Sequence, residues 1–241
     1  MLGYLRLETL RILRDGGYLF MSVISPLVMY LVFTNLKMTG QDHHDTAIYT
    51  MVGMAGFGAI GAALTNGVGI AEDKALGWIR QLRLLPLTPL QVVTARTLCA
   101  MVVAIPPILA VCLAGGLVNG VSLGIGRWAA IGGLLWIGIA PIAVLGLGIG
   151  YLLDAQKAQA AGAVGYMGLS LVGGLWFPLS AFPHWLASIS PLTPVNRYGE
   201  LGWRSAAGAV PSLTGVAILA GWSAVFTALA VYAYRRSAVT A

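Results

Sequence analysis

Histidine and acidic side chains that could bind a metal ion stand together at Asp42, His43, His44 and Asp45. His184, far along the chain, could add a ligand, since zinc takes three or four nitrogen, sulfur or oxygen ligands. Nothing fixes the spacing between the two places, so we interpret the cluster as a solvated loop and keep a metal site as the alternative. The sequence has neither a GxxxxGK[ST] phosphate loop nor an HExxH zinc motif, so we predict no catalytic, cofactor-binding or metal-binding residue.

The longest polar interruption of this apolar sequence runs from Glu72 to Thr97. Its basic side chains make it a candidate site of contact with other molecules. On a helix over residues 74–85, most apolar side chains fall within an arc of roughly 120° and most polar ones on the other side. This pattern predicts an amphipathic helix along a membrane surface, with its basic face in water. Its candidate contact residues are Lys74, Gly77, Trp78, Arg80, Arg83 and Pro86.

The end of this surface helix and the start of the next helix are both marked in the sequence. Pro86 lacks the amide N–H and disfavours helical geometry in the residue before it, so the helix ends there. Thr88 is a plausible N-cap, Pro89 suits the first helical position, and Gln91 completes a capping box. The surface helix is therefore expected to be joined rigidly to the next segment.

The composition predicts an all-α integral membrane protein. Hydrophobic residues make up 58% of the chain and charged residues 9%, against about 45–50% and about 25% in soluble domains. Uncharged runs long enough to cross a bilayer as helices recur, whereas barrel-like alternation does not. The net charge of +6 does not indicate nucleic-acid binding, because the basic residues lie beside apolar spans. We expect a single transmembrane domain over residues 1–241.

Six spans are predicted, preceded by an amphipathic segment at residues 1–15 that is not a signal peptide. The spans are residues 16–36, 46–71, 89–118, 128–153, 158–179 and 211–234. We expect Pro106-Pro107 to kink the third span. Gly146 and Gly150 in the fourth span indicate close helix packing, within the subunit rather than at a dimer seam.

The distribution of lysine and arginine predicts the orientation in the membrane. An even number of spans places both termini on one side of the membrane, and the 74–85 helix lies on the same side. This side carries ten basic residues, whereas the other side carries four. The ten are Arg6, Arg11, Arg14, Lys74, Arg80, Arg83, Arg96, Lys157, Arg235 and Arg236, and the four are Lys37, Arg127, Arg197 and Arg204. Basic residues favour the cytoplasmic side, so both termini are predicted to be cytoplasmic.

Residues 180–207 are too apolar for a free loop and too rich in proline for one helix. We expect two short helices, one after Pro183 and one after Pro194, that form a re-entrant hairpin in the outer leaflet. In the second helix Glu200 can pair with Arg204 four residues on, or with Arg197 three residues before. Tryptophans at 176, 185 and 203 suit the membrane interface.

Large soft side chains in the second and fifth spans could line a path through the membrane. The candidates are Met54, Phe57, Tyr166 and Trp176, because methionine and aromatic surfaces tolerate varied ligands. Ordinary core or lipid-facing positions are the alternative for each of them.

The layout of the whole chain resembles the permease subunits of type-2 ABC transporters, which export drugs, natural products, lipids or polysaccharides. It matches in the amphipathic start, the six spans, the helix closed by Leu85-Pro86-Leu87-Thr88, and the hairpin. The hairpin residues that carry the resemblance are Phe177-Pro178-Leu179, Phe182-Pro183, Trp185-Leu186, Pro194 and Arg197-Tyr198. The large outer domain that some relatives insert between the first two spans is missing, which argues against a peptide-handling or sensor role.

The resemblance implies a half-transporter in a bacterial cell membrane. Two six-span permeases, identical or paralogous, would enclose a path for an amphipathic drug, antibiotic or lipid-like substrate. Two separate ATPase subunits would bind the cytoplasmic helices and would hold the ATP and magnesium, so this chain would bind no cofactor and be no enzyme. Residues 1–15 would be the connecting helix and residues 74–85 the coupling helix.

Other functions remain open on the sequence. An uncoupled scaffold or channel-like subunit would use the basic helix only to bind anionic lipid headgroups. A polysaccharide-exporting permease fits the same layout, but the predicted path has few polar residues. A membrane enzyme is a weaker alternative, because no nucleophile–base pair is indicated.

Overall fold

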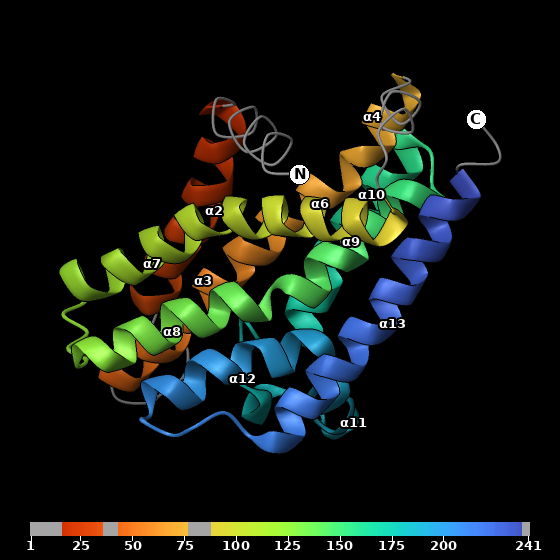
Figure 1. Ribbon diagram of the computed structural model, residues 1–241. Helices are drawn as coiled ribbons and strands as arrows, with labels where there is room; N and C mark the ends of the chain where they lie inside the picture. The colour runs from red at the N-terminus through yellow and green to blue at the C-terminus, as the bar shows by residue number, and fades with distance from the viewer. Residues whose placement is uncertain (1–15, 36–42, 77–87, 238–241) are drawn as a thin grey trace.

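The computed structural model describes residues 16–35, 43–76 and 88–237, and all regular structure in these residues is helical. Figure 1 shows the arrangement. The long helices are α2 (Gly16–Asn35), α3 (His43–Val68), α6 (Pro89–Val103), α7 (Ile105–Leu117), α8 (Ile125–Gly138), α9 (Ala140–Leu152), α10 (Ala155–Val172), α12 (Pro194–Ala206) and α13 (Leu213–Ser237). The short ones are α4 (Ile70–Ala75), η1 (Leu179–Ala181), α11 (His184–Ile189) and η2 (Ser190–Leu192).

Four stretches of the described residues are long and apolar enough to cross a membrane: Asp45–Ala75, Pro89–Leu117, Ile125–Leu152 and Leu213–Ser237. A shorter apolar stretch, Ser22–Asn35, lies in α2. These helices identify the chain as an integral membrane protein. Helix α10, in the predicted fifth span, is not among them, since its first turns are polar. The number of spans therefore stays a prediction.

Breaks within the long helical stretches occur beside prolines and glycine. The α6–α7 break at Ala104 lies just before Pro106 and Pro107, as predicted. A similar break at Ile139, between α8 and α9, precedes Pro141 and was not predicted. In both cases proline supplies no N–H to the helix ladder. At Gly69 the second span divides into α3 and α4.

Helix α3 is the centre of the fold, packing against α2, α7, α9, α10 and α12. Its contact with α9 is close because glycines face one another. A Cβ added at Gly67 would lie 2.5 Å from the carbonyl carbon of Gly146, and one at Gly150 would lie 2.5 Å from the carbonyl oxygen of Gly67. The prediction that Gly146 and Gly150 serve packing within the subunit is confirmed.

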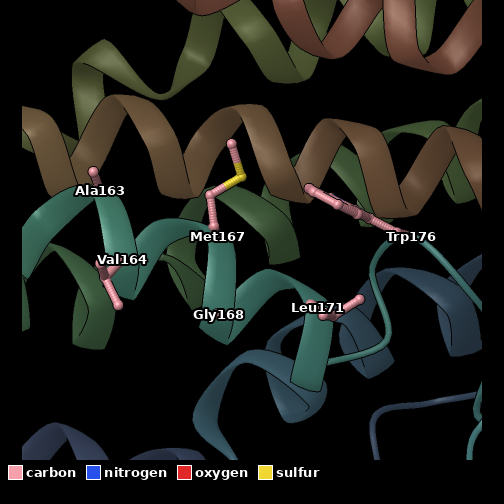
Figure 2. A pocket seen from close by; sticks show the side chains of 6 residues that line it. All are labelled: Ala163, Val164, Met167, Gly168, Leu171 and Trp176. Atoms are coloured by element: carbon pink, nitrogen blue, oxygen red, sulfur yellow. The ribbon is translucent and has the colours of Figure 1, made fainter.

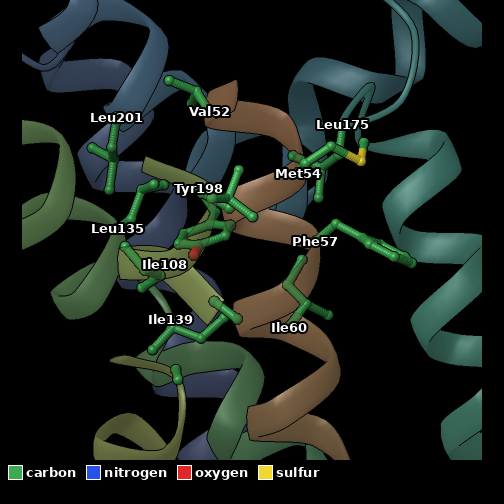
Figure 3. Close-up of a cluster of buried hydrophobic side chains, with 14 of the residues drawn as sticks. Val52, Met54, Phe57, Ile60, Ile108, Leu135, Ile139, Leu175, Tyr198 and Leu201 are labelled. Atoms are coloured by element: carbon green, nitrogen blue, oxygen red, sulfur yellow. The ribbon is translucent and has the colours of Figure 1, made fainter. Parts of the chain in front are cut away.

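The main hydrophobic core surrounds α3 and includes fully buried Tyr30, Met51 and Tyr198. Figure 3 shows Tyr198 with Leu135 and Ile139 on one side of α3, whereas Phe57 points the other way, toward α10. The core thus extends around α3, and Phe57 is its member on the side of α10.

The helix ends gather at two opposite ends of the molecule (Figure 1). At the end that we call the α4 end, α4 lies with the last turns of α9 and α13 and the first turn of α10. At the other end, which we call the hairpin end, lie α11, α12 and the α7–α8 turn. There a Cβ on Gly208 would lie 2.9 Å from the Arg127 guanidinium.

Several boundaries differ from the sequence prediction, two of them in an informative way. Helix α3 begins at His43, within the loop that was expected up to Asp45. Helix α10 ends at Val172 rather than Leu179, because the backbone reverses at Gly174, which has a φ of 76°. Such a φ suits glycine and ends a helix. The two short helices expected after Pro183 and Pro194 are present as α11 and α12.

Candidate functional site

A buried ion pair connects α4 to α6 at the α4 end. The Arg96 guanidinium donates to the Asp73 carboxylate at 3.0 Å, and the side chains are 4% and 11% exposed, respectively. Asp73 lies four residues before the segment 77–87 and Arg96 nine residues after it. We call α4 and α6, which enter and leave the segment 77–87, its two stems. The ion pair therefore joins the two stems of the predicted coupling helix.

The side chain of Lys74, the first of the contact residues predicted on the 74–85 helix, points to α9. Its ammonium group donates to the carbonyl oxygens of Leu153 at 2.8 Å and Tyr151 at 3.2 Å. A lysine at the carbonyl end of a helix satisfies free acceptors and matches the helix dipole. The other predicted contact residues, Gly77, Trp78, Arg80, Arg83 and Pro86, lie outside the described residues.

The predicted capping box at the start of α6 is confirmed. The Gln91 amide donates to the Thr88 hydroxyl oxygen at 3.3 Å, and the Thr88 amide donates to the Gln91 side-chain oxygen at 2.8 Å. Pro89 occupies the first turn. The second stem thus begins as a well-capped helix that continues directly to Arg96.

Three of the four predicted path residues meet between α3 and α10. The Phe57 ring stacks on Tyr166 with centroids 4.4 Å apart, and Trp176 meets Phe57 edge-on at 5.5 Å. Tyr166 lies against α3, because a Cβ on Gly61 would be 2.9 Å from its hydroxyl oxygen. Met54, the fourth candidate, is fully buried in the core and is not part of this cluster.

An open apolar groove of about 520 Å³ runs beside the aromatic cluster (Figure 2). Val164 and Met167 in this groove are 73% and 53% exposed, so nothing in the described chain covers this face of α10. The lining residues are Ala163, Val164, Met167, Gly168, Leu171 and Trp176.

Polar groups stand at the α4 end of the same α3–α10 boundary. The Gln159 amide donates to the Glu72 carboxylate at 2.9 Å, and both side chains are exposed. Thr65, seven residues before Glu72 and therefore closer to the aromatic cluster, is also exposed. The boundary therefore changes from polar at the α4 end to aromatic in the middle.

In the hairpin, Glu200 pairs with Arg197, one of its two predicted partners. The Arg197 guanidinium donates to the Glu200 carboxylate at 2.6 Å, and the Ser212 hydroxyl donates to it at 2.7 Å. Arg204, the other predicted partner, donates instead to the Val210 carbonyl oxygen at 2.8 Å. Burial raises the pKa of Glu200, but the Ser212 and Arg197 hydrogen bonds outweigh it and hold the pKa below its usual value.

The other predicted hairpin residues divide into buried and exposed ones. Pro194 follows the N-cap Thr193 at the start of α12, and Tyr198 in that helix is fully buried. Helix α12 packs against α8, α13 and α3. By contrast, Pro183 is exposed at the start of α11, and Trp185 is 65% exposed. α12 is thus part of the core, whereas α11 presents an aromatic side chain outward.

Sequence reasoning missed the partners that lie far apart in the chain. Asp73 was not singled out, and Arg96 was counted as a surface cation. A weak signal existed, since Asp73 lies two residues after the second predicted span and Arg96 lies within the first turns of the third. For Ser212 with Glu200, and for Asn196, whose amide donates to the Gly173 carbonyl at 3.0 Å, no local signal exists.

Metal-binding and catalytic alternatives gain no support from the described residues. They contain no group of three histidine, cysteine or acidic side chains that could hold a metal, although the side chains of His43 and His44 lie outside them. A GxSxG spacing does occur at Gly120, Ser122 and Gly124, and it lies in the turn between α7 and α8. The nucleophile elbow with this spacing needs a strand before it and a histidine partner, and the described residues supply neither.

Comparison with known proteins agrees with the architecture. The chain is 28% identical over 233 residues to "Putative transport permease YvfS" of Bacillus subtilis (strain 168), an alignment that covers 95% of this chain and 94% of that protein. The sequence profile described as "ABC-2 type transporter" matches residues 4–199. Because this match covers most of the chain, the protein belongs to the ABC-2 type transporter family.

Proposed function

We propose that this chain is the membrane-spanning permease subunit of an ATP-driven exporter. Membership of the family supports a transport permease that associates with ABC ATPase subunits. In the proposed complex two permeases, identical or paralogous, form the path, and two ATPase subunits hold ATP and magnesium. The complex lies in a bacterial cell membrane with both permease termini in the cytoplasm.

The observation that carries the coupled function is the Asp73–Arg96 ion pair. It ties together the helices that enter and leave the segment 77–87. Lys74 adds a link from the first stem to α9, and the Thr88 capping box stiffens the second. A load applied to the segment would therefore move α4, α6 and α9 together, as energy coupling requires. A lipid anchor needs no such links.

The uncovered groove on α10 supports an amphipathic substrate and a second permease. One chain leaves this apolar face open beside the Phe57–Tyr166–Trp176 cluster. A second subunit facing it would close the groove into a path lined by apolar and aromatic surface. Such a lining favours a drug, antibiotic or lipid-like molecule over a polysaccharide, which needs many hydrogen-bonding groups.

The test is co-purification of the ATPase with a permease carrying Arg80→Glu and Arg83→Glu. Reversed charge on the docking face should reduce both ATPase association and transport, while the permease still inserts. Arg235→Glu, at the exposed end of α13, is the matched control and should leave both unchanged. Full association together with full transport in the double variant would refute coupling through this segment.

The uncoupled scaffold makes a different prediction in the same experiment. There each lost basic residue would weaken membrane attachment by about 1 kcal/mol, whichever residue is changed. Association with an ATPase would not respond to Arg80 or Arg83. Measuring membrane attachment and ATPase association in the same preparations therefore separates the two functions.

A further inference from the structure

We propose that Glu72 is a specificity-determining residue that makes the α3–α10 boundary select amphipathic cations over neutral and anionic molecules. This inference deepens the proposed function, on which it depends, by naming the substrate class. The α3–α10 strip is defined here as Glu72, Gln159, Thr65, Tyr166, Phe57 and Trp176.

The strip is continuous along α10 on one side and along α3 and α4 on the other. On α10, Gln159 and Tyr166 are seven residues apart, so they share a face and are separated by about 10 Å along the axis. On α3, Phe57, Gly61 and Thr65 follow one another at four-residue intervals, with Gly61 in contact with Tyr166. Glu72 follows seven residues after Thr65, beyond the Gly69 break, in α4, and its bond to Gln159 shows that α4 and α10 meet there.

Glu72 is an acid with no cationic partner among the described residues. Its carboxylate accepts a hydrogen bond from a neutral amide and is exposed. The neighbouring charges are occupied elsewhere: Asp73 is paired with Arg96, Lys74 donates to carbonyls of α9, and Lys157 is paired with Asp154 at 2.8 Å. Among the described residues, Glu72 is therefore an acid without a cationic partner at the α4 end of the strip, which we call its mouth.

The aromatic part of the strip suits the same ligand. A cation is attracted to the faces of tyrosine, phenylalanine and tryptophan, and most strongly where water is excluded. Phe57 is 1% exposed, whereas Tyr166 and Trp176 are half-buried, and Trp176 also lines the apolar α10 groove (Figure 2). A molecule with a positive charge and an apolar body would be attracted by the acid at the mouth and then by the aromatic rings.

The test uses two probes of nearly equal size and opposite charge, tetraphenylphosphonium and tetraphenylborate. Their binding to the full chain in phosphatidylcholine nanodiscs is measured by calorimetry, with empty nanodiscs as the background. We expect the wild-type protein to bind the cation more tightly. Glu72→Gln should weaken cation binding by at least about fivefold, the effect of one unit charge at about 4 Å in water, and should not weaken anion binding.

The matched control is Asp154→Asn. It removes the same charge at the α4 end, but away from the strip, and asparagine keeps the capping of α10, where Asp154 accepts from the Lys157 amide. This variant should keep the wild-type preference. Equal losses in the two variants, an unchanged preference in Glu72→Gln, or no binding of tetraphenylphosphonium to the wild type would each overturn the proposal. Binding needs no ATPase, so failure here is distinct from failure of the ATPase co-purification.

Discussion

Removing Asp73 tests whether the two stems of the coupling segment are held by their ion pair. In Asp73→Ala the Arg96 guanidinium, 4% exposed in the wild type, keeps its charge and loses a carboxylate 3.0 Å away. Breaking a buried pair by removing one partner costs about 3–5 kcal/mol. For a chain of this size 1 kcal/mol corresponds to about 2–4 °C in Tm, so we expect Tm to fall by about 6–20 °C.

The assay is thermal unfolding of the detergent-purified permease, followed by tryptophan fluorescence. The control is Lys157→Ala, which removes one partner of an exposed pair whose side chains are 73% and 57% exposed. Its Tm should stay close to that of the wild type, because solvent screens exposed pairs.

A double-mutant cycle identifies the pair as the cause. Adding Arg96→Met to Asp73→Ala replaces the remaining buried charge with an apolar side chain, which restores much of the stability when a buried pair is the origin of the loss. The reasoning would be refuted if Asp73→Ala lowered Tm by less than about 2 °C, or if the losses of the two single variants simply added in the double variant. The double variant Asp73→Arg, Arg96→Asp should retain more ATPase coupling than either single variant.

Three further predictions concern packing, the hairpin and orientation. Gly146→Leu should lower the yield of folded protein, since even a Cβ there would lie 2.9 Å from a backbone oxygen of α3, whereas Gly132→Leu points into open space and should fold; equal yields would contradict this. Glu200→Ala should reduce transport more than Asp45→Ala at equal expression, because Glu200 holds hydrogen bonds and Asp45 is exposed; equal, negligible effects would favour a solvated surface. A single cysteine at Arg80 should resist an impermeant reagent added outside, and labelling from outside would reverse the predicted orientation.

Features that depend on neighbouring residues could be predicted from the sequence. The capping box at Thr88 and the break before Pro106 rest on the residue types of one turn, whose geometry is the same in any fold. The short helices after Pro183 and Pro194 follow from the same local rule. Pro141 obeys it too, and its break was missed only because a long apolar run was interpreted as one straight span.

Features that depend on how helices meet could not be predicted. Asp73 and Arg96 are 23 residues apart, and nothing in their spacing indicates that α4 and α6 place them 3.0 Å from each other. Glu200 had two candidate partners at helical spacing, and the choice of Arg197 depends on Ser212 and on the path of the chain after α12. The aromatic cluster lies between these cases: its residue types indicated a path, but only the packing of α10 on α3 brings three of them together.

The pairing of charges bears on the predicted orientation in an instructive way. Arg96 and Lys157 count toward the ten basic residues that are predicted to be cytoplasmic, and Arg197 counts toward the four on the other side, yet each of the three is paired with an acid. A rule based on net charge would discount all three. The positive-inside rule counts lysine and arginine near the spans and gives acids little weight, so it is not a net-charge rule. Ion pairs in the finished fold therefore do not weaken the inference that the α4 end is cytoplasmic.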